Sequence, residues 1–268
     1  MRQEHDADWR TPSSGVRRDI LRAGGGKEGV RERSMCTPQL RRDSFGDARE
    51  LVKGAGDHMR TCQLCFAGST EAWDEPLIEL PNFMVLPSLG ALVEGWVLIV
   101  PKKHFLSLAT LPDSLTFEMR GLQRMLCERL QRIYGPVAAF EHGPAAEQRT
   151  VGCGVDHAHM HIVPVDFDLS VAVAPYLPPG STWSEATVTD CRIAVQEGDD
   201  YLYLEQPLGR PRIVRHGNLG SQLFRRAIAS HLGVPDDFNW RNNPQIENVD
   251  KTIRTFKTAV QTDSEFVV

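Results

Sequence analysis

Apolar residues form four strand-like segments between residues 61 and 168. LIELPNFMVLP (77–87) and GWVLIVP (95–101) are rich in β-branched and aromatic residues, and proline or glycine bounds them. VAAFE (137–141) and VDHAHMHIVPV (155–165) follow with a similar character. We therefore expect four β-strands in this part of the chain.

A helical period separates the second of these strands from the third. Six apolar residues recur there at steps of three or four: Leu115, Met119, Leu122, Leu126, Leu130 and Ile133. Pro112 and Asp113 are typical of a helix start, and Gly135 is typical of a helix end. The order strand, strand, helix, strand, strand predicts an α+β domain with a mainly antiparallel sheet and one long amphipathic helix.

A second region follows the fourth strand. PYLPPGSTW (175–183) reads as a connector rich in proline and glycine. Three later segments predict strands and two predict helices: CRIAVQEG (191–198), DYLYLEQP (200–207) and RPRIVRHG (210–217) for the strands, and SQLFRRAIASHLG (221–233) and NVDKTIRTFKTAV (248–260) for the helices. We therefore expect a smaller α+β extension over residues 169–268, after a main domain over 59–168.

Residues 1–58 differ from the rest of the chain. They mix charges of both signs with the glycine run 24–26 and contain few large apolar residues. Such a segment cannot bury enough apolar surface to offset the entropy of ordering, so we expect a largely disordered tail. Met35 is an alternative start of the chain.

The composition is that of an ordinary globular protein. Of the 268 residues, 41% are hydrophobic and 24% are charged, and a net charge of −5 argues against a broad basic surface for nucleic acid. Residues 2–10 are too polar for a secretory signal, and no apolar run approaches membrane-spanning length. We therefore expect a cytoplasmic protein with no membrane partner.

Three of the nine histidines, His157, His159 and His161, occupy alternate positions. On a strand they would share one face, with neighbours roughly 6–7 Å apart and the outer two roughly 13 Å apart. Zinc binds histidine nitrogens at about 2.1 Å in a tetrahedron, so one ion can hardly reach all three. The three histidines must therefore have different roles.

Cys62 and Cys65 are the only closely paired cysteines, and a Cys-x-x-Cys pair supplies half of a tetrahedral zinc site. Because no second pair exists, histidines or carboxylates must complete it. His157 is one candidate. His104, just past the 95–101 strand, is the other.

His159 would then remain a neutral imidazole beside the metal, able to attack an electrophile. Gly152 and Gly154, just upstream, can expose backbone N–H groups that suit a phosphoryl group. Lys102 and Lys103 are candidates for attracting such an anion.

Three motifs in this order resemble the histidine-triad superfamily: CQLCF (62–66), GWVLIVPKKHF (95–105) and HAHMHIV (157–163). The resemblance covers roughly residues 60–168. It implies that His159 attacks the α-phosphorus of a nucleotide and forms a nucleotidyl-histidine intermediate, with His161 helping to position it.

Related galactose-1-phosphate uridylyltransferases hold a zinc ion, and the resemblance carries its ligands over to Cys62, Cys65, His104 and His157. These are the same four residues that the cysteine pair and the two candidate histidines suggested. Four protein ligands leave no open position for a water molecule, so the zinc would be structural or orienting.

Some positions depart from the superfamily pattern. The aspartate that usually grips the ribose is missing from FMVLPSLGALVEG (83–95), where the first acid is Glu94. Glu141 replaces the usual asparagine, and Gly152-Cys153-Gly154 replaces the usual Gly-Gln-Ser. These positions normally contact ribose and phosphate, so the resemblance supports the chemistry more strongly than the substrate.

LFRRAIASHLGVPDDFNW (223–240) and ENVDKTIRTFK (247–257) resemble the second conserved block of the CwfJ-like proteins, which associate with splicing and lariat RNA. Their first block is itself a histidine-triad relative. RNA is therefore a possible partner, although a small nucleotide is favoured.

Three functions remain open at this point. The first is a hydrolase or nucleotidyltransferase that cleaves a phosphoanhydride, phosphoramidate or phosphoester of a nucleoside monophosphate. The second is a catalytically silent module that binds nucleotide or RNA. The third is a hydrolytic zinc with His157 and His159 as ligands. We expect either a homodimer or a monomer in which the extension takes the place of a second subunit.

Overall fold

The computed structural model describes residues 62, 64–65, 75–152, 154–207 and 209–262, all of which belong to one compact unit. The segment predicted to be disordered, 1–58, lies outside the described residues. Within them, no helix is both long and apolar enough to cross a bilayer.

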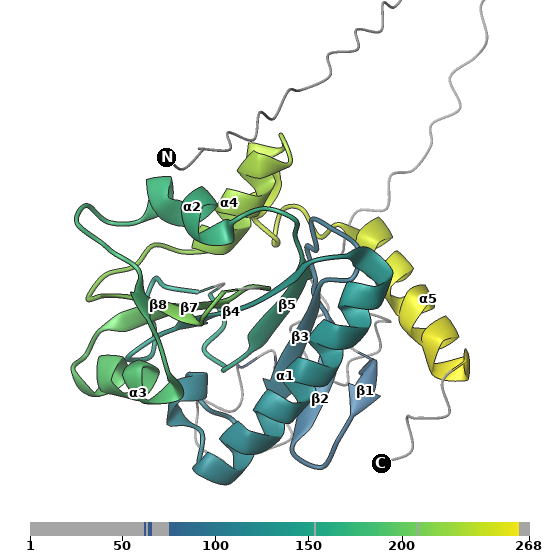
Figure 1. The fold of residues 1–268 in the computed structure, drawn as a ribbon, viewed down its shortest axis with the longest axis horizontal. Coiled ribbons are helices and arrows are strands. Elements are labelled where there is room, and N and C mark those ends of the chain that lie inside the picture. Colours follow the sequence, from purple (N-terminus) through teal and green to yellow (C-terminus); the bar gives the residue numbers. More distant parts are fainter. Residues whose placement is uncertain (1–61, 63, 66–74, 153, 208, 263–268) are drawn as a thin grey trace, which may run out of the picture. The chain divides into compact units, whose positions relative to one another are not determined.

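The fold is α+β and is built on one antiparallel sheet, which confirms the predicted class (Figure 1). Eight strands of the described residues pair in the order β1-β2-β3-β5-β4-β7-β8-β6. They are β1 (Ile78–Glu79), β2 (Phe83–Pro87), β3 (Val97–Pro101), β4 (Val137–Gly143), β5 (Met160–Pro164), β6 (Ser184–Glu185), β7 (Asp200–Glu205) and β8 (Arg212–His216).

Helices cover both faces of this sheet (Figure 1). One apolar cluster packs α1 (Asp113–Tyr134) and α3 (Val188–Gln196) on one face, and a second packs α2 (Leu169–Val173) and α4 (Leu223–His231) on the other. The last helix, α5 (Ile246–Thr262), contributes to both clusters. Short 3₁₀ helices complete the fold at Leu108–Thr110, Ala174–Tyr176 and Pro235–Phe238.

Helix α1 confirms the periodicity seen in the sequence. Four of the six predicted apolar positions are fully buried, Leu115 packs partly against the core, and Ile133 is 45% exposed because the helix has almost ended there. Pro112 precedes the helix, and Gly135 ends it with a φ of 85°, a conformation that favours glycine.

The extension continues the sheet of the preceding domain. Strand β7 pairs with β4 over five residues, from Ala139 opposite Glu205 to Gly143 opposite Tyr201. The sheet is thus continuous across the predicted boundary at residues 168 and 169, and the division into two domains stays a prediction.

Two predicted strands are wrong in detail. CRIAVQEG belongs to α3, because Thr187 and Asp190 form a capping box that starts a helix and buries Cys191 and Ala194. Segment 77–87 is two antiparallel strands, β1 and β2, separated by a turn.

Candidate metal and histidine site

The four predicted metal ligands lie together, with their ligand atoms all within 4.8 Å of one another. Nδ1 of His157 is 3.3 Å from Sγ of Cys62 and 3.4 Å from Sγ of Cys65. Nδ1 of His104 is 3.3 Å from Sγ of Cys65. In a zinc tetrahedron these sulfur–nitrogen edges measure about 3.6 Å, so the four residues fit the ion.

The hydrogen bonds of His157 prepare it for a metal. Its Nε2 lies 2.8 Å from the carbonyl oxygen of Pro101, which can only accept, so Nε2 carries the proton and Nδ1 presents its lone pair to the sulfurs. Burial lowers the pKa of His157 to about 4, which keeps the imidazole neutral. Burial and the neighbouring Cys62 raise the pKa of Cys65 to about 12, so a cation is needed to stabilise its thiolate.

His157 and His159 precede β5 instead of lying on it, so the prediction of one strand face for all three histidines is wrong. The backbone turns tightly there, because N–H of His157 donates to the carbonyl of Val155 at 2.9 Å. The next residue, Ala158, is bonded to the segment that follows β3, because its N–H donates to the carbonyl of Phe105 at 2.7 Å. The turn moves His157 towards the cysteines, beyond the end of β3.

His159 is buried, with 8% of its surface exposed. Its Nδ1 lies 2.7 Å from the carbonyl oxygen of His157, so Nδ1 carries the proton and Nε2 holds the lone pair. Burial, together with the positive charge of Arg225, lowers the pKa of His159. The result is a neutral imidazole with a nucleophilic Nε2.

His161 has the opposite tautomer. It lies on β5, where its Nδ1 accepts a hydrogen bond from Nε1 of Trp96 at 3.1 Å, so its Nε2 carries the proton. Its ring lies 4.8 Å from that of His159 and stacks on Phe140 at 4.6 Å. Burial holds its pKa well below the ordinary range. The two neighbouring rings thus offer one lone pair and one N–H donor.

Arg225 is the main residue of this site that sequence reasoning missed. It lies on α4 and is 2% exposed, with its guanidinium 4.5 Å from the ring of Trp96. It donates to the carbonyls of Gly90 at 2.5 Å and Leu89 at 2.8 Å, and to Oγ of Ser88 at 3.0 Å. The only signal in the sequence was an arginine at an otherwise apolar helical position.

Strand β4 places the neighbouring residues Glu141 and His142 on opposite faces of the sheet. His142 faces the histidines, with its ring 6.0 Å from that of His161, and burial lowers its pKa to about 3. Glu141 faces the α1 side, where it accepts from N–H of Leu108 at 2.7 Å and from the hydroxyl of Tyr201. Burial raises the pKa of Glu141 to about 7. The structure therefore does not bring Glu141, predicted to bind substrate, to His159.

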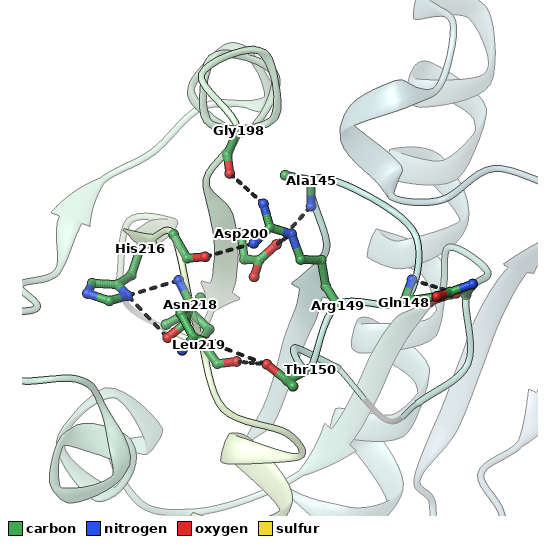
Figure 2. A network of polar contacts seen from close by, with 11 residues as sticks. Ala145, Gln148, Arg149, Thr150, Gly198, Asp200, His216, Asn218 and Leu219 are labelled. Atoms are coloured by element: carbon green, nitrogen blue, oxygen red, sulfur yellow. Dashed lines mark hydrogen bonds and ion pairs between the residues drawn. The ribbon is translucent and has the colours of Figure 1, made fainter.

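The loop from β4 to the histidines is tied to the extension (Figure 2). Arg149 donates to the carbonyls of Gly217 at 3.0 Å and Gly198 at 3.2 Å. N–H of Ala145 donates to Oδ1 of Asp200, which is buried at the start of β7, at 3.0 Å. The extension thus fixes the path of the loop that carries Gly152 and Gly154.

The remaining predicted substrate-binding residues divide into two groups. Gly152 and Gly154 lie in this loop with φ values of 91° and 72°, and Cys153 lies outside the described residues. Lys102 instead pairs with Glu79 at 2.7 Å, and Nζ of Lys103 lies 5.6 Å from the ring of Phe105. Neither of these two contacts involves His159 or His161.

A family comparison agrees with this architecture. Residues 51–177 match a family described as "Protein similar to CwfJ C-terminal". This part of the chain, just under half of its length, is therefore similar to the CwfJ-like family. The match ends before residues 223–257, whose resemblance to the second CwfJ-like block therefore stays a prediction.

Solved structures of low similarity include two with histidine-triad names and one phosphorylase. A Hit-like protein from Bartonella henselae is 20% identical over 33% of this chain and 64% of its own length, less than two thirds, with a TM-score of 0.28. A zinc-bound histidine triad protein from Mycobacterium smegmatis is 22% identical over 40% of this chain and 76% of its own, with a TM-score of 0.32. The yeast Ap4A phosphorylase Apa2 in complex with AMP is 11% identical over 53% and 58%, with a TM-score of 0.33. No curated protein matches.

Proposed function

We propose that this protein is a nucleotide hydrolase or nucleotidyltransferase that forms a covalent nucleotidyl-histidine at His159. The bond it cleaves is a phosphoanhydride, phosphoramidate or phosphoester of a nucleoside monophosphate. The similarity of residues 51–177 to the CwfJ-like family and the histidine-triad motifs of the sequence support the nucleotide, and the arrangement of His159 supports the chemistry.

One observation carries the proposal: Nδ1 of His159 lies 2.7 Å from the carbonyl of His157 inside a buried site. This contact fixes the tautomer and leaves the lone pair on Nε2. A neutral imidazole is nucleophilic only through an unprotonated nitrogen, and burial keeps the ring unprotonated near neutral pH.

The reaction follows from this tautomer. The Nε2 lone pair of His159 attacks phosphorus, and the bond from phosphorus to the leaving group breaks, so the leaving group departs with the bonding electrons. Water or another acceptor then attacks phosphorus and loses a proton, and the nitrogen–phosphorus electrons return to Nε2. Nε2–H of His161 and the backbone around Gly154 are suited to stabilise phosphate charge.

The same arrangement argues for a non-hydrolytic metal. Cys62, Cys65, His104 and His157 would hold zinc with all four tetrahedral positions filled by protein. When bound, the ion supplies a cross-link that orients His157, whose carbonyl in turn holds His159. His159 is then a nucleophile and not a ligand, against the alternative of a hydrolytic zinc.

The test uses the purified protein, His159→Ala and a control, His231→Ala, which changes an exposed histidine at the end of α4. Each is incubated with dinucleoside polyphosphates, nucleoside phosphoramidates and nucleotide sugars, and mass spectrometry follows mononucleotide release and any adduct on the protein. We expect His159→Ala to lose at least about a thousandfold in turnover, with no adduct and unchanged zinc content.

Turnover that survives in His159→Ala would reject the covalent role. Wild-type protein that binds nucleotides without turnover, with affinity that His159→Ala leaves intact, would instead support the binding module. Loss of turnover on chelation without loss of fold, together with zinc loss in His159→Ala, would support the hydrolytic zinc.

A further inference from the structure

Two cation–aromatic pairs lie close together in the extension, around the 3₁₀ helix Pro235–Phe238. The guanidinium of Arg226 lies 3.8 Å from the ring of Phe238, and that of Arg241 lies 4.5 Å from the ring of Trp240. We call these four residues the 226/238–241 surface. Arg241 is exposed and the other three are half-buried, so a ligand can reach the surface.

The 226/238–241 surface borders the histidine site on one side through Gly154. Nη2 of Arg241 donates to the carbonyl of Gly154 at 2.8 Å. A Cβ on Gly154 would lie 2.8 Å from the same guanidinium, so the contact is close. Gly154 belongs to the loop that leads into His157 and His159.

The surface borders the histidine site on the other side through Gly90. A Cβ on Gly90 would lie 2.4 Å from Cβ of Trp240, and N–H of Gly90 donates to the carbonyl of Pro244 at 2.7 Å. The carbonyl of Gly90 accepts from Arg225, whose charge lowers the pKa of His159. Segment 238–244 therefore contacts both the loop that leads into His157 and the loop that accepts hydrogen bonds from Arg225.

This combination of groups suits a nucleotide. A guanidinium binds a phosphate through paired N–H donors, and an aromatic or guanidinium plane stacks on a nucleobase without selecting its identity. An exposed arginine beside an indole, next to the proposed phosphoryl site, offers both contacts for one nucleotide unit.

We propose that the 226/238–241 surface is a specificity-determining subsite for a second nucleotide, attached beyond the phosphate that His159 attacks. Arg241 binds a phosphate of that unit and Trp240 stacks on its base. The inference rests on the proposed function and extends it, because it makes the preferred substrate a nucleotide joined to another nucleotide. The second unit can come from a dinucleoside polyphosphate or from the end of an RNA strand.

Binding to the His159→Ala protein tests the subsite separately from catalysis. Calorimetry compares AMP with diadenosine tetraphosphate and with the 5′-phosphorylated dinucleotide pApA. We expect at least one two-nucleotide ligand to bind about tenfold more tightly than AMP, with an advantage that falls as salt rises. The stronger of the two ligands identifies the source of the second nucleotide.

Variants in the His159→Ala background identify the residues that give the two-nucleotide ligand its higher affinity than AMP. Arg241→Gln and Trp240→Ala should each remove most of the preference for the two-nucleotide ligand, and alanine keeps the Cβ that lies against Gly90. Arg210→Gln is the matched control, because Arg210 is an exposed arginine that pairs with Glu185 on β6. It should leave the preference unchanged, and circular dichroism checks that every variant is folded.

Two results would overturn the subsite. One is equal affinity for AMP and for both two-nucleotide ligands. The other is a loss in Arg241→Gln that is the same for AMP and the longer ligands, since Arg241 would then act only by holding Gly154. Neither depends on turnover, so failure of the proposed reaction and failure of the subsite are separate outcomes.

Discussion

The metal cluster and the neighbouring histidine pair use the same type of side chain in opposite ways. In the cluster, His157 donates Nε2–H to a carbonyl and turns its Nδ1 lone pair to two cysteines. In the pair, His159 donates Nδ1–H to a carbonyl and keeps its lone pair on Nε2. The position of the carbonyl that accepts the N–H hydrogen bond decides which ring nitrogen keeps the lone pair. The proposed roles, metal ligand for His157 and nucleophile for His159, follow from this difference.

The two regions also differ in what supports them. The cluster depends on short segments at Cys62–Cys65, His104 and His157. The pair depends on distant groups, because Trp96 orients His161 and Arg225 packs on Trp96 from helix α4. We therefore expect changes in the cluster to act on metal and stability, and changes around the pair to act on turnover and pH dependence.

Breaking the cluster should have the largest effect on stability. We expect Cys65→Ser to lose the zinc ion and to lower the unfolding free energy by about 4 kcal/mol, or Tm by about 10 °C, because metal binding is coupled to folding. Elemental analysis and calorimetry measure both quantities. Cys127→Ser, a half-buried cysteine of α1, is the control that should keep its metal. A Cys65→Ser protein with full metal content contradicts the ligand assignment.

The pH dependence of stability tests the burial of His142 as a neutral ring. Burial depresses the folded-state pKa of His142 to about 3, so the unfolded chain binds this proton and the folded protein does not. The stabilising effect is present above pH 6.5 and is lost as pH falls towards 3. We expect His142→Asn to reduce the loss between pH 6.5 and 4.5 by about 2 kcal/mol. Urea unfolding at several pH values measures this difference. If the unfolding free energy fell equally with pH in both proteins, the burial of a neutral His142 ring would be refuted.

Replacing Trp96 tests the support of the pair. Trp96→Phe removes the donor to Nδ1 of His161 and frees its tautomer, so we expect turnover to fall about tenfold, or about 1.4 kcal/mol in the barrier, with zinc retained. Nitrogen NMR of the His161 ring reports the tautomer directly. Trp183→Phe is the control, because Trp183 donates to the carbonyl of Ser170 elsewhere in the fold. An unchanged His161 spectrum in Trp96→Phe would mean that the hydrogen bond from Trp96 does not fix the tautomer of His161.

The smallest effect is expected on the far face of β4. Glu141→Gln should change turnover by less than about threefold, or about 0.7 kcal/mol, since Glu141 points to Leu108 and Tyr201. Its pKa is raised to about 7, so its contribution to stability is present below pH 4.5 and is lost as pH rises through 7. Glu141→Gln should remove that loss in denaturant titrations. A large fall in turnover at normal stability would return Glu141 to the substrate site.

Local patterns in the sequence predicted the elements that depend on local interactions. The apolar period predicted helix α1, and the Cys-x-x-Cys spacing predicted that Cys62 and Cys65 lie in one cluster. Both features depend on residues close together in the sequence, and both are found in the structure. The segment 191–198 reads equally as strand or helix from its apolar residues alone, and the capping box at Thr187 and Asp190 decided in favour of the helix.

The supports of the histidine pair could not be predicted in the same way. Arg225 follows His161 by a long stretch of chain, and only the packing of α4 against the sheet brings it to Trp96. Alternation on β4 allowed either Glu141 or His142 to face the histidines, and the register of β4 with β5, which places Phe140 opposite His161, selected His142.

The pairing of β4 between β5 and β7 has a consequence for synthesis. A ribosome delivers the histidines first, and strand β7, which covers the other edge of β4, and helix α4 with Arg225 emerge only later. Until then one edge of β4 is unpaired and His159 lacks the buried Arg225 beside it. The site around His159 is therefore complete only after the carboxy-terminal residues have been made.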